Sequence, residues 1–169
     1  IGDACLNGQD RKKAGNALYG AYGQDFLCAD GRRVMVIGLT ARQWRGLVQV
    51  TETGDAIAAL EHALGVSLDD EGNRWRFRKQ ITEIFSPWFA ARRVAEFERS
   101  FNDAGVTWSQ FRTIRQALRE DPDLGCDNPM FSELMQPGVG RFPVPAHPAA
   151  FSASGRGDAR PAPALGAHT

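Results

Sequence analysis

The clearest pattern in the chain is a pair of short apolar stretches joined by a polar turn. Val34–Ile37 forms a nearly continuous apolar run, which predicts a strand that is covered on both faces. Asp30-Gly31, just before this run, is among the strongest short-range signals for a tight hairpin turn. The pattern therefore predicts a β-hairpin with strands at Gln24–Cys28 and Arg32–Ile37.

Helical periodicity follows the hairpin. Thr40–Gln43 has the sequence of a capping box and predicts a helix that turns Trp44 and Leu47 toward the interior. A second helix is predicted to begin at Asp55, taken as its N-cap, and to end with Gly65 at its C′ position. Both helices carry an apolar stripe, so each is expected to pack on a common core.

Two further helices are predicted beyond Gly65. The third covers Glu71–Phe85. Its basic residues are interpreted as a solvated face; they are Arg74, Arg76, Arg78 and Lys79. Ser86-Pro87 then predicts a new N-terminus, because serine caps helices and proline is favoured at the first helical position. Gly105 closes this fourth helix, whose aromatic residues at helical spacing indicate core packing.

The pattern is weaker in the last third of the chain. A short strand is predicted at Val106–Trp108, and a second capping box opens a helix at Thr113–Glu120, which Asp121-Pro122 ends. Another strand is predicted at Phe131–Met135. Together these elements predict an α+β fold with a small antiparallel sheet packed with helices, followed by an extended C-terminal connector.

Composition divides this prediction into three segments. Residues 1–14 are polar and charged, and they are interpreted as the remnant of a preceding linker or domain. Residues 15–136 are predicted to form the small α+β domain. Residues 137–169 are rich in proline, alanine and glycine, so they are expected to form a connector that does not order by itself. Both ends of the chain break off abruptly, so a fragment of a longer protein is expected.

Composition and charge argue against several classes of function. Twenty basic residues balance 20 acidic ones without a basic block, so neither nucleic acid nor a membrane surface is expected as a partner. No apolar run approaches the ~20 residues of a membrane span, and there is no signal-peptide pattern. The cysteines and histidines are scattered, which argues against a metal site and indicates a reducing, cytoplasmic location. They are Cys5, Cys28 and Cys126, and His62, His147 and His168.

The stretch Gly15–Gly23 has the composition of a ligand-binding loop. Glycines let the backbone approach a ligand closely, and tyrosines offer flat apolar area with a polar tip. The candidate substrate-binding residues are Gly15, Asn16, Tyr19, Gly20, Tyr22 and Gly23. A hairpin lead-in with ordinary turn glycines is the alternative. The preceding Asp10–Lys13 is interpreted as a solvated charged cluster, with a phosphate contact near the loop as its alternative.

No catalytic motif is recognisable within the chain. The sequence holds no GxSxG or HExxH motif and no serine–histidine neighbourhood. Asp69–Glu71 is acidic, but its place at a helix start is explained by the helix dipole. No catalytic residue is therefore assigned here, and the main nucleophile or base is expected elsewhere in the intact protein.

The ordered set of motifs resembles the small domain of the class III CoA-transferases, the family that includes formyl-CoA transferase and α-methylacyl-CoA racemase. Ala29-Asp30-Gly31 and the strand Val34–Gly38 match the family pattern near its start. The Gly105-Val106 step, Asp121-Pro122 and the ending Arg160–Thr169 match in the same order. The resemblance covers nearly the whole chain.

The resemblance implies a small domain that packs on a Rossmann-like large domain within an interlocked homodimer. It implies an acyl-CoA substrate, no bound cofactor, and a nucleophilic aspartate upstream of Ile1 that forms an aspartyl-CoA thioester. Within the family, the loop and Pro137–Arg141 are most similar to members that move CoA between the two carboxyls of one C5 dicarboxylate. A racemase-like enzyme and a non-catalytic interaction module are the alternatives. The chain alone is expected to be inactive.

Overall fold

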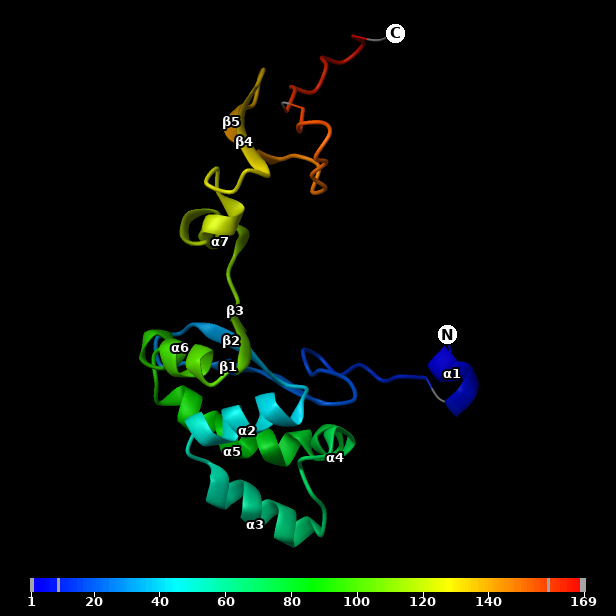
Figure 1. The fold of residues 1–169 in the computed structure, drawn as a ribbon, viewed down its shortest axis with the longest axis vertical. Coiled ribbons are helices and arrows are strands. Elements are labelled where there is room, and N and C mark those ends of the chain that lie inside the picture. The colour runs from blue at the N-terminus through cyan, green and yellow to red at the C-terminus, as the bar shows by residue number, and fades with distance from the viewer. Residues whose placement is uncertain (1, 9, 158, 168–169) are drawn as a thin grey trace. The chain divides into compact units, whose positions relative to one another are not determined.

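The computed structural model describes residues 2–8, 10–157 and 159–167. His168 and Thr169, which end the C-terminal motif, lie outside the described residues, as does Ile1. The chain divides into two compact units, Ile1–Phe111 and Arg112–Thr169, which run from blue to green and from green to red in Figure 1.

The first unit is built around an antiparallel sheet with the strand order β1-β2-β3. β1 spans Tyr22–Leu27, β2 spans Arg33–Gly38 and β3 spans Thr107–Gln110. The turn between β1 and β2 has Gly31 at a φ of +74°. The carboxylate of Asp30 accepts a hydrogen bond from the backbone two residues on, at 3.2 Å. The predicted hairpin and its turn are therefore confirmed.

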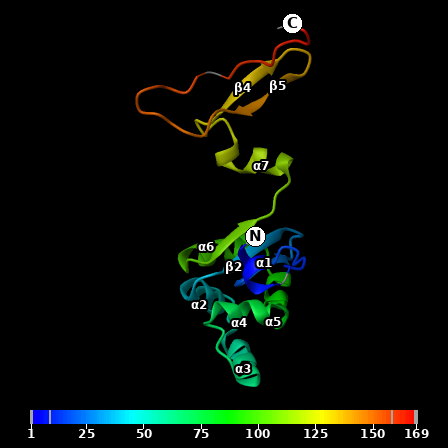
Figure 2. The same cartoon turned by 90° about the vertical axis from the view of Figure 1, so that its right-hand side faces the viewer.

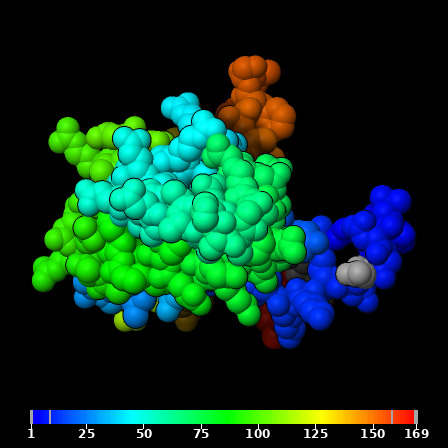
Figure 3. All heavy atoms as spheres, turned by 90° about the horizontal axis from the view of Figure 1, so that it is seen from below, coloured from blue at the N-terminus to red at the C-terminus, as the bar shows by residue number. Residues whose placement is uncertain are grey.

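Helices cover this sheet, and they connect its second and third strands. α2 packs on β2 and α5 packs on β1, and both lie on the same side of the sheet in Figure 1. α3 lies outside α2 and α5 and faces the viewer in Figure 3. The helices of this unit are α1 (Gly2–Asn7), α2 (Ala41–Val50), α3 (Gly54–Leu64), α4 (Glu71–Arg76), α5 (Arg78–Ala90) and α6 (Val94–Asp103).

An aromatic cluster forms the centre of the core. Phe26 of β1 stacks on Phe89 of α5, with ring centroids 4.2 Å apart. Phe97 and Phe101 of α6 meet the Phe89 ring edge-on, at 5.6 and 5.9 Å. All four side chains are buried, and burying each ring stabilises the fold by about 1.5–3 kcal/mol. The prediction that the helical aromatic residues pack in the core is confirmed.

Two predicted helix boundaries are wrong. α5 continues through Ser86-Pro87, where the sequence predicts a new helix. The Ser86 hydroxyl donates to the carbonyl of Thr82 at 2.6 Å, so it is bonded within α5 and does not cap the next helix, which begins at Val94. The predicted helix 71–85 is also interrupted, because Phe77 has a φ of −102° between α4 and α5.

Other helix ends follow the predicted capping chemistry. The capping boxes at Thr40 and Thr113 are both present, with the threonine oxygen accepting from a backbone N–H three residues on. Gly65 ends α3 in the left-handed conformation, at a φ of +64°. Asp55 is not the N-cap, because Thr53 holds that position. Asp55 lies in the first turn, where its charge interacts favourably with the helix dipole.

Arg74 departs furthest from its predicted environment. The sequence predicts that it is solvated, but its side chain is completely buried. The guanidinium donates to the carbonyls of Gly38, Leu39, Leu68 and Asp69, at 2.7 to 3.1 Å. Burial lowers the pKa of Arg74, yet these carbonyls compensate the cation. The arginine thus ties the end of β2 to the segment that precedes α4.

The described residues of the second unit form one α-helix and a hairpin, both visible in Figure 2. α7 spans Ile114–Glu120 and is followed by a 3-10 turn, η1 (Pro122–Leu124). β4 (Phe131–Gln136) pairs antiparallel with β5 (Gly140–Pro145). This pairing keeps both strands in one unit, whereas the sequence prediction divides the chain after residue 136. The residues after β5 hold no helix or strand in their described part.

Candidate functional site

The backbone of the loop Gly15–Gly23 is fixed by its own glycines. Gly15 and Gly20 have φ values of +62° and +86°, in the region that favours glycine. The N–H of Leu18 donates to the carbonyl of Gly23 at 3.0 Å, which closes the loop before β1. A Cβ atom on Gly23 would lie 2.6 Å from the Cβ of Leu18, so a side chain does not fit there. Loop geometry alone therefore accounts for these three glycines, as the alternative interpretation expects.

Tyr19 is held at the surface in a row of two aromatic rings flanked by two guanidinium groups. The guanidinium of Arg11 lies 3.7 Å from the centre of the Tyr19 ring. The Tyr19 and Trp75 rings are 4.8 Å apart, and the guanidinium of Arg78 lies 3.9 Å from the Trp75 ring. The cation–π contacts and the contact between the two rings together fix the position of the Tyr19 ring. Tyr19 remains 47% exposed, so a tyrosine in a fixed position is presented to solvent.

Tyr22 is a core residue, in contrast to Tyr19. Its side chain has no exposed surface, and its ring packs against Trp44 and Phe85 at 5.8 and 5.7 Å. Its hydroxyl lies 3.1 Å from the hydroxyl of Thr82, and burial raises its pKa. The structure therefore corrects the sequence interpretation of this residue, because a buried ring is not accessible to a substrate. Asn16, by contrast, is exposed.

A hollow of about 520 Å³ lies beside the loop, and we call it the loop pocket. Its lining residues come from the start of the loop, from β1 and from α5. They are Lys13, Ala14, Ala17, Gln24, Arg78, Lys79, Thr82 and Glu83. Three of them are cations and one is an anion, so the lining has a positive excess.

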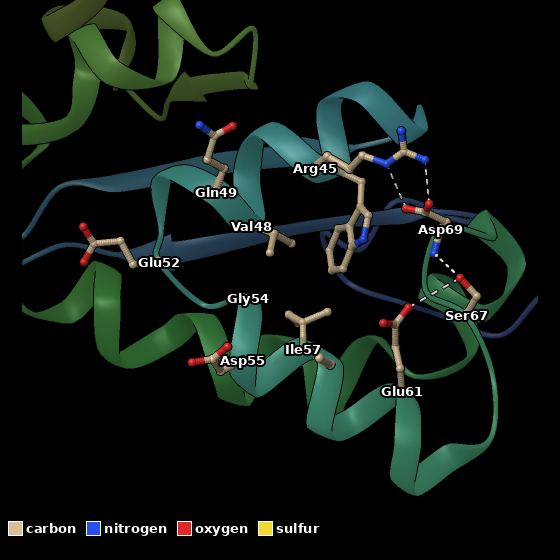
Figure 4. Close-up of a pocket in the computed structure, with 12 residues that line it drawn as sticks. Arg45, Val48, Gln49, Glu52, Gly54, Asp55, Ile57, Glu61, Ser67 and Asp69 are labelled. Atoms are coloured by element: carbon tan, nitrogen blue, oxygen red, sulfur yellow. Dashed lines mark hydrogen bonds and ion pairs between the residues drawn. The ribbon is translucent and has the colours of Figure 1, made fainter.

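A second hollow of about 520 Å³ lies between α2 and α3, and we call it the helix groove (Figure 4). Val48 and Ile57 point into it from the two helices, and Trp44 also lines it. Its rim carries the carboxylates of Glu52, Asp55, Glu61 and Asp69 and the guanidinium of Arg45. The groove therefore combines an apolar floor with an acidic rim.

Two of the rim carboxylates are bonded within the chain. Arg45 donates to Asp69 at 2.6 Å, and this contact lowers the pKa of the Asp69 carboxyl. The backbone N–H of Leu68 donates to the carboxylate of Glu61 at 2.5 Å. Asp69 thus forms an ion pair with Arg45 at the rim of the groove. Its neighbour Asp70 caps α4, as its place at a helix start predicts.

The sequence does not identify the helix groove. The apolar stripes of the two helices are predictable, but they predict packing on a common core and do not indicate a space between the helices. The turn residue Glu52, with a φ of +55°, is the one positive-φ residue other than glycine in the described chain. No sequence signal reveals this conformation, because glutamate rarely adopts it.

Other chemistry is sparse in the described ranges 2–8, 10–157 and 159–167. Cys5, Cys28 and Cys126 are free, and burial raises the pKa of Cys28 to about 11. No group of three or more potential metal ligands is found in these ranges. No helix within them is long and apolar enough to cross a membrane.

The fold and the loop can be compared with known proteins. The family model for CoA-transferase family III matches residues 1–169, the whole chain. The chain belongs to this family. It is 47% identical over 169 residues to the 2-methylfumaryl-CoA isomerase of Chloroflexus aurantiacus, covering all of this chain and 41% of that protein. The resemblance expected from the sequence is confirmed.

A second relative is more distant. The chain is 28% identical over 92 residues to the succinyl-CoA:glutarate CoA-transferase of Mus musculus, covering 54% of this chain and 21% of that protein. The chain therefore spans less than half the length of either curated relative.

Solved structures support the fold. A CaiB/BaiF family protein from Brucella suis superposes with a TM-score of 0.69 at 18% identity, over 98% of this chain and 40% of that one. A protein from M. tuberculosis gives a TM-score of 0.61 at 16% identity, over 83% of this chain and 36% of that one. The predicted α+β class, with small antiparallel sheets and packed helices, is confirmed.

Proposed function

We propose that the protein moves CoA between the two carboxyls of one C5 dicarboxylate, converting 2-methylfumaryl-CoA from its C1 to its C4 thioester. The observation that carries this proposal is the 47% identity to a 2-methylfumaryl-CoA isomerase along the entire chain. This similarity includes the loop before β1 and both units.

The proposed chemistry is covalent catalysis by a carboxylate outside this chain. The aspartate attacks the C1 thioester and expels CoA thiolate, which leaves a mixed anhydride. The thiolate then attacks the aspartyl carbonyl, giving an aspartyl-CoA thioester and a free C1 carboxylate. The C4 carboxylate then attacks the aspartyl-CoA thioester and expels CoA thiolate, which leaves a second mixed anhydride. The thiolate attacks the C4 carbonyl of this anhydride, which gives the C4 thioester and releases the aspartate carboxylate. No oxidant or reductant takes part.

The contribution of this chain is to cover the reacting thioester. Gly15 and Gly20 set the loop backbone, and Asn16 and Tyr19 are its exposed polar and aromatic groups. A loop that closes over a thioester excludes water, which would otherwise hydrolyse the anhydride. Gly23 contributes by letting the loop pack against Leu18. In the intact protein the unit would pack on a large domain, within an interlocked homodimer in the cytoplasm.

Intermolecular CoA transfer between two dicarboxylates is a second candidate. The observation that favours it is the match to a succinyl-CoA:glutarate CoA-transferase over 92 residues. The same covalent steps would serve, with a second acid replacing the C4 carboxylate. A racemase-like reaction and a non-catalytic role remain the alternatives drawn from the sequence.

The test is an assay of the full-length protein with 2-methylfumaryl-CoA carrying the thioester at C1. Conversion to the C4 ester without added acid supports the proposal, and no conversion overturns it. Isotope-labelled free dicarboxylate in the same assay separates the candidates, because only intermolecular transfer moves CoA to the labelled acid. Deuterium exchange at C2 of a 2-methylacyl-CoA would instead indicate a racemase.

A further inference from the structure

The loop pocket has a charge pattern that the fold itself does not explain. We infer that it is an oxyanion-binding subsite for the acyl-CoA substrate, and this inference rests on the proposed function. Lys13 enters the pocket from the segment before the loop, and Arg78 and Lys79 enter from α5. Glu83 is the one carboxylate in the lining, so cations outnumber anions three to one.

The three cations are not neutralised by carboxylates in the described part of the chain. In the described ranges, none of Lys13, Arg78 and Lys79 forms an ion pair. Lys13 and Lys79 are exposed, while Arg78 is half-buried. Arg78 donates to the carbonyl of Trp75 at 2.8 Å and stacks on the Trp75 ring, which fixes its position. This bond uses one of the five N–H donors of a guanidinium.

The position of two of these cations is locally unfavourable. Arg78 and Lys79 occupy the first turn of α5, which has no acidic residue and no side-chain cap. Positive charge near a helix N-terminus is unfavourable, because the helix dipole favours anions there. A bound oxyanion would interact favourably with both side chains and with the helix. Departures from local preference of this kind are expected where function requires them.

The pocket is built against the loop that carries Asn16 and Tyr19. Ala14 and Ala17 line it, and the N–H of Ala17 donates to the carbonyl of Ala14 at 3.1 Å, forming the turn that contains Asn16. Tyr19 contacts Trp75, on which Arg78 is stacked. An anion in the pocket would therefore hold one end of the ligand while the loop covers the thioester.

A C5 dicarboxyl-CoA ester offers oxyanions from two sources. The acyl group has a free carboxylate, and CoA has both the 3′-phosphate and the pyrophosphate. The three cations recognise the chemistry that these groups share, which is negative charge on several oxygens. The experiment must therefore include probes that carry each group separately.

The test uses the full-length protein with the double substitution Lys13→Gln and Lys79→Gln. We expect KM for 2-methylfumaryl-CoA to rise about tenfold or more with little change in kcat, the size of one lost charge-assisted contact. Lys13→Arg with Lys79→Arg keeps the charges and should retain most of the affinity. Arg99→Gln, a surface cation on α6 that pairs with Asp103, is the matched control and should leave KM unchanged. Melting temperatures of all variants verify folding.

Calorimetry with three probes, free 2-methylfumarate, CoA and dephospho-CoA, identifies which oxyanion of the substrate binds in the loop pocket. If the pocket binds the acyl carboxylate, the double substitution weakens the binding of free 2-methylfumarate (mesaconate) and leaves the binding of CoA unchanged. If the pocket binds the 3′-phosphate, the substitution weakens the binding of CoA and leaves the binding of dephospho-CoA unchanged. If the pocket binds the pyrophosphate, the substitution weakens the binding of both. Unchanged KM and unchanged affinity for all three probes would overturn the inference.

These outcomes are separate from the failure of the proposed function. If the unmodified protein does not convert 2-methylfumaryl-CoA, the function is wrong, but CoA and dephospho-CoA binding still report on the pocket. If conversion is normal and the double substitution changes nothing, the function stands and the subsite is wrong.

Discussion

The loop pocket and the helix groove have the same volume, about 520 Å³ each, but opposite charge. The pocket has three cations and one carboxylate, whereas the groove has four carboxylates and one guanidinium. A formal net charge of +0 therefore conceals a separation of charge within the first unit. Net charge alone argues against polyanions as partners of the whole surface, but it does not report on a local site.

The two hollows also differ in what their charges do. In the groove, Arg45 bonds Asp69, and Glu61 accepts from the backbone of the segment that precedes α4. These charges hold α2, α3 and their connection together. The cations of the pocket form no ion pair in the described ranges, and Arg78 bonds only the carbonyl of Trp75, so the pocket is the better candidate for an external ligand. The comparison predicts that groove substitutions change stability and pocket or loop substitutions change activity.

The largest expected effect on stability comes from Arg74, because it bonds the carbonyl of Asp69, which lines the helix groove. Arg74→Met keeps much of the apolar stem but removes the donors to the carbonyls of Leu68 and Asp69. We expect the free energy of unfolding to fall by about 3 kcal/mol, because several buried carbonyls lose their partner. Urea denaturation of the full-length protein measures this change. Arg76→Met, at an exposed position on the same helix, should change stability by less than about 0.5 kcal/mol; equal losses would contradict the assignment.

Arg74 also shows where sequence reasoning is limited. The sequence shows Arg74 among other basic residues of one predicted helix, so it is interpreted with them as part of a solvated face. The actual difference arises from tertiary structure: two chain segments that are far apart in the sequence present their carbonyls to the same point. Local patterns predict the hairpin, the capping boxes and the apolar stripes, because each depends on neighbouring residues. They do not predict a buried cation with two of its four carbonyl partners 35 and 36 residues away.

Tyr19 provides the next test, on the loop side. Tyr19→Ala is expected to lower turnover about tenfold, equivalent to about 1.4 kcal/mol, while changing stability less, because the side chain is 47% exposed. Tyr22→Phe is the matched comparison, since it removes only the buried hydroxyl bonded to Thr82. That variant should lose about 1 kcal/mol of stability with turnover retained. If the Tyr19→Ala variant retains full turnover, the assignment of Tyr19 to the substrate-binding site is wrong.

The two tyrosines illustrate how far the sequence defines the candidate site. Both fit the composition of a ligand loop, and only their burial separates them. Tyr22 is the first residue of β1, and the pleat of the strand directs it into the core. The strand start is not visible in the sequence, because the loop glycines continue as far as Gly23. The position of Lys13 beside α5 is likewise set by the folded loop.

A smaller effect is expected at the turn between α2 and α3. Three helices of the first unit end in the same hydrogen-bonded arrangement, with Gly65, Gly105 and Glu52 at the left-handed position. Glu52→Gly should therefore raise the free energy of unfolding by about 1 kcal/mol, since glycine carries no Cβ penalty there. Glu52→Ala removes the charge but keeps the Cβ, so it separates backbone strain from electrostatics. If alanine stabilises as much as glycine, the charge of the acidic rim is the cause, and the strain interpretation fails.

The smallest expected effect concerns the ion pair of the groove. The pKa of Asp69 is lowered in the folded protein, chiefly by the hydrogen bond from Arg45, so its contribution to stability is present above the unfolded pKa of about 3.9. That contribution is lost as the pH falls through the lower folded pKa. Because the Arg45 side chain is 68% exposed and Asp69 is 47% exposed, the coupling at pH 7 should be small and should decrease with salt.

A double-mutant cycle with Arg45→Gln and Asp69→Asn measures this coupling by urea denaturation at pH 7, and again at successively lower pH down to 3. The cycle is needed because acid protonates other carboxylates as well, and only the difference between variants isolates this pair. A coupling that persists unchanged at pH 3 would mean that Asp69 acts as a packed polar group and not as a charge. In that case the helix groove and the loop pocket would differ in shape, and not in whether their charged groups form ion pairs.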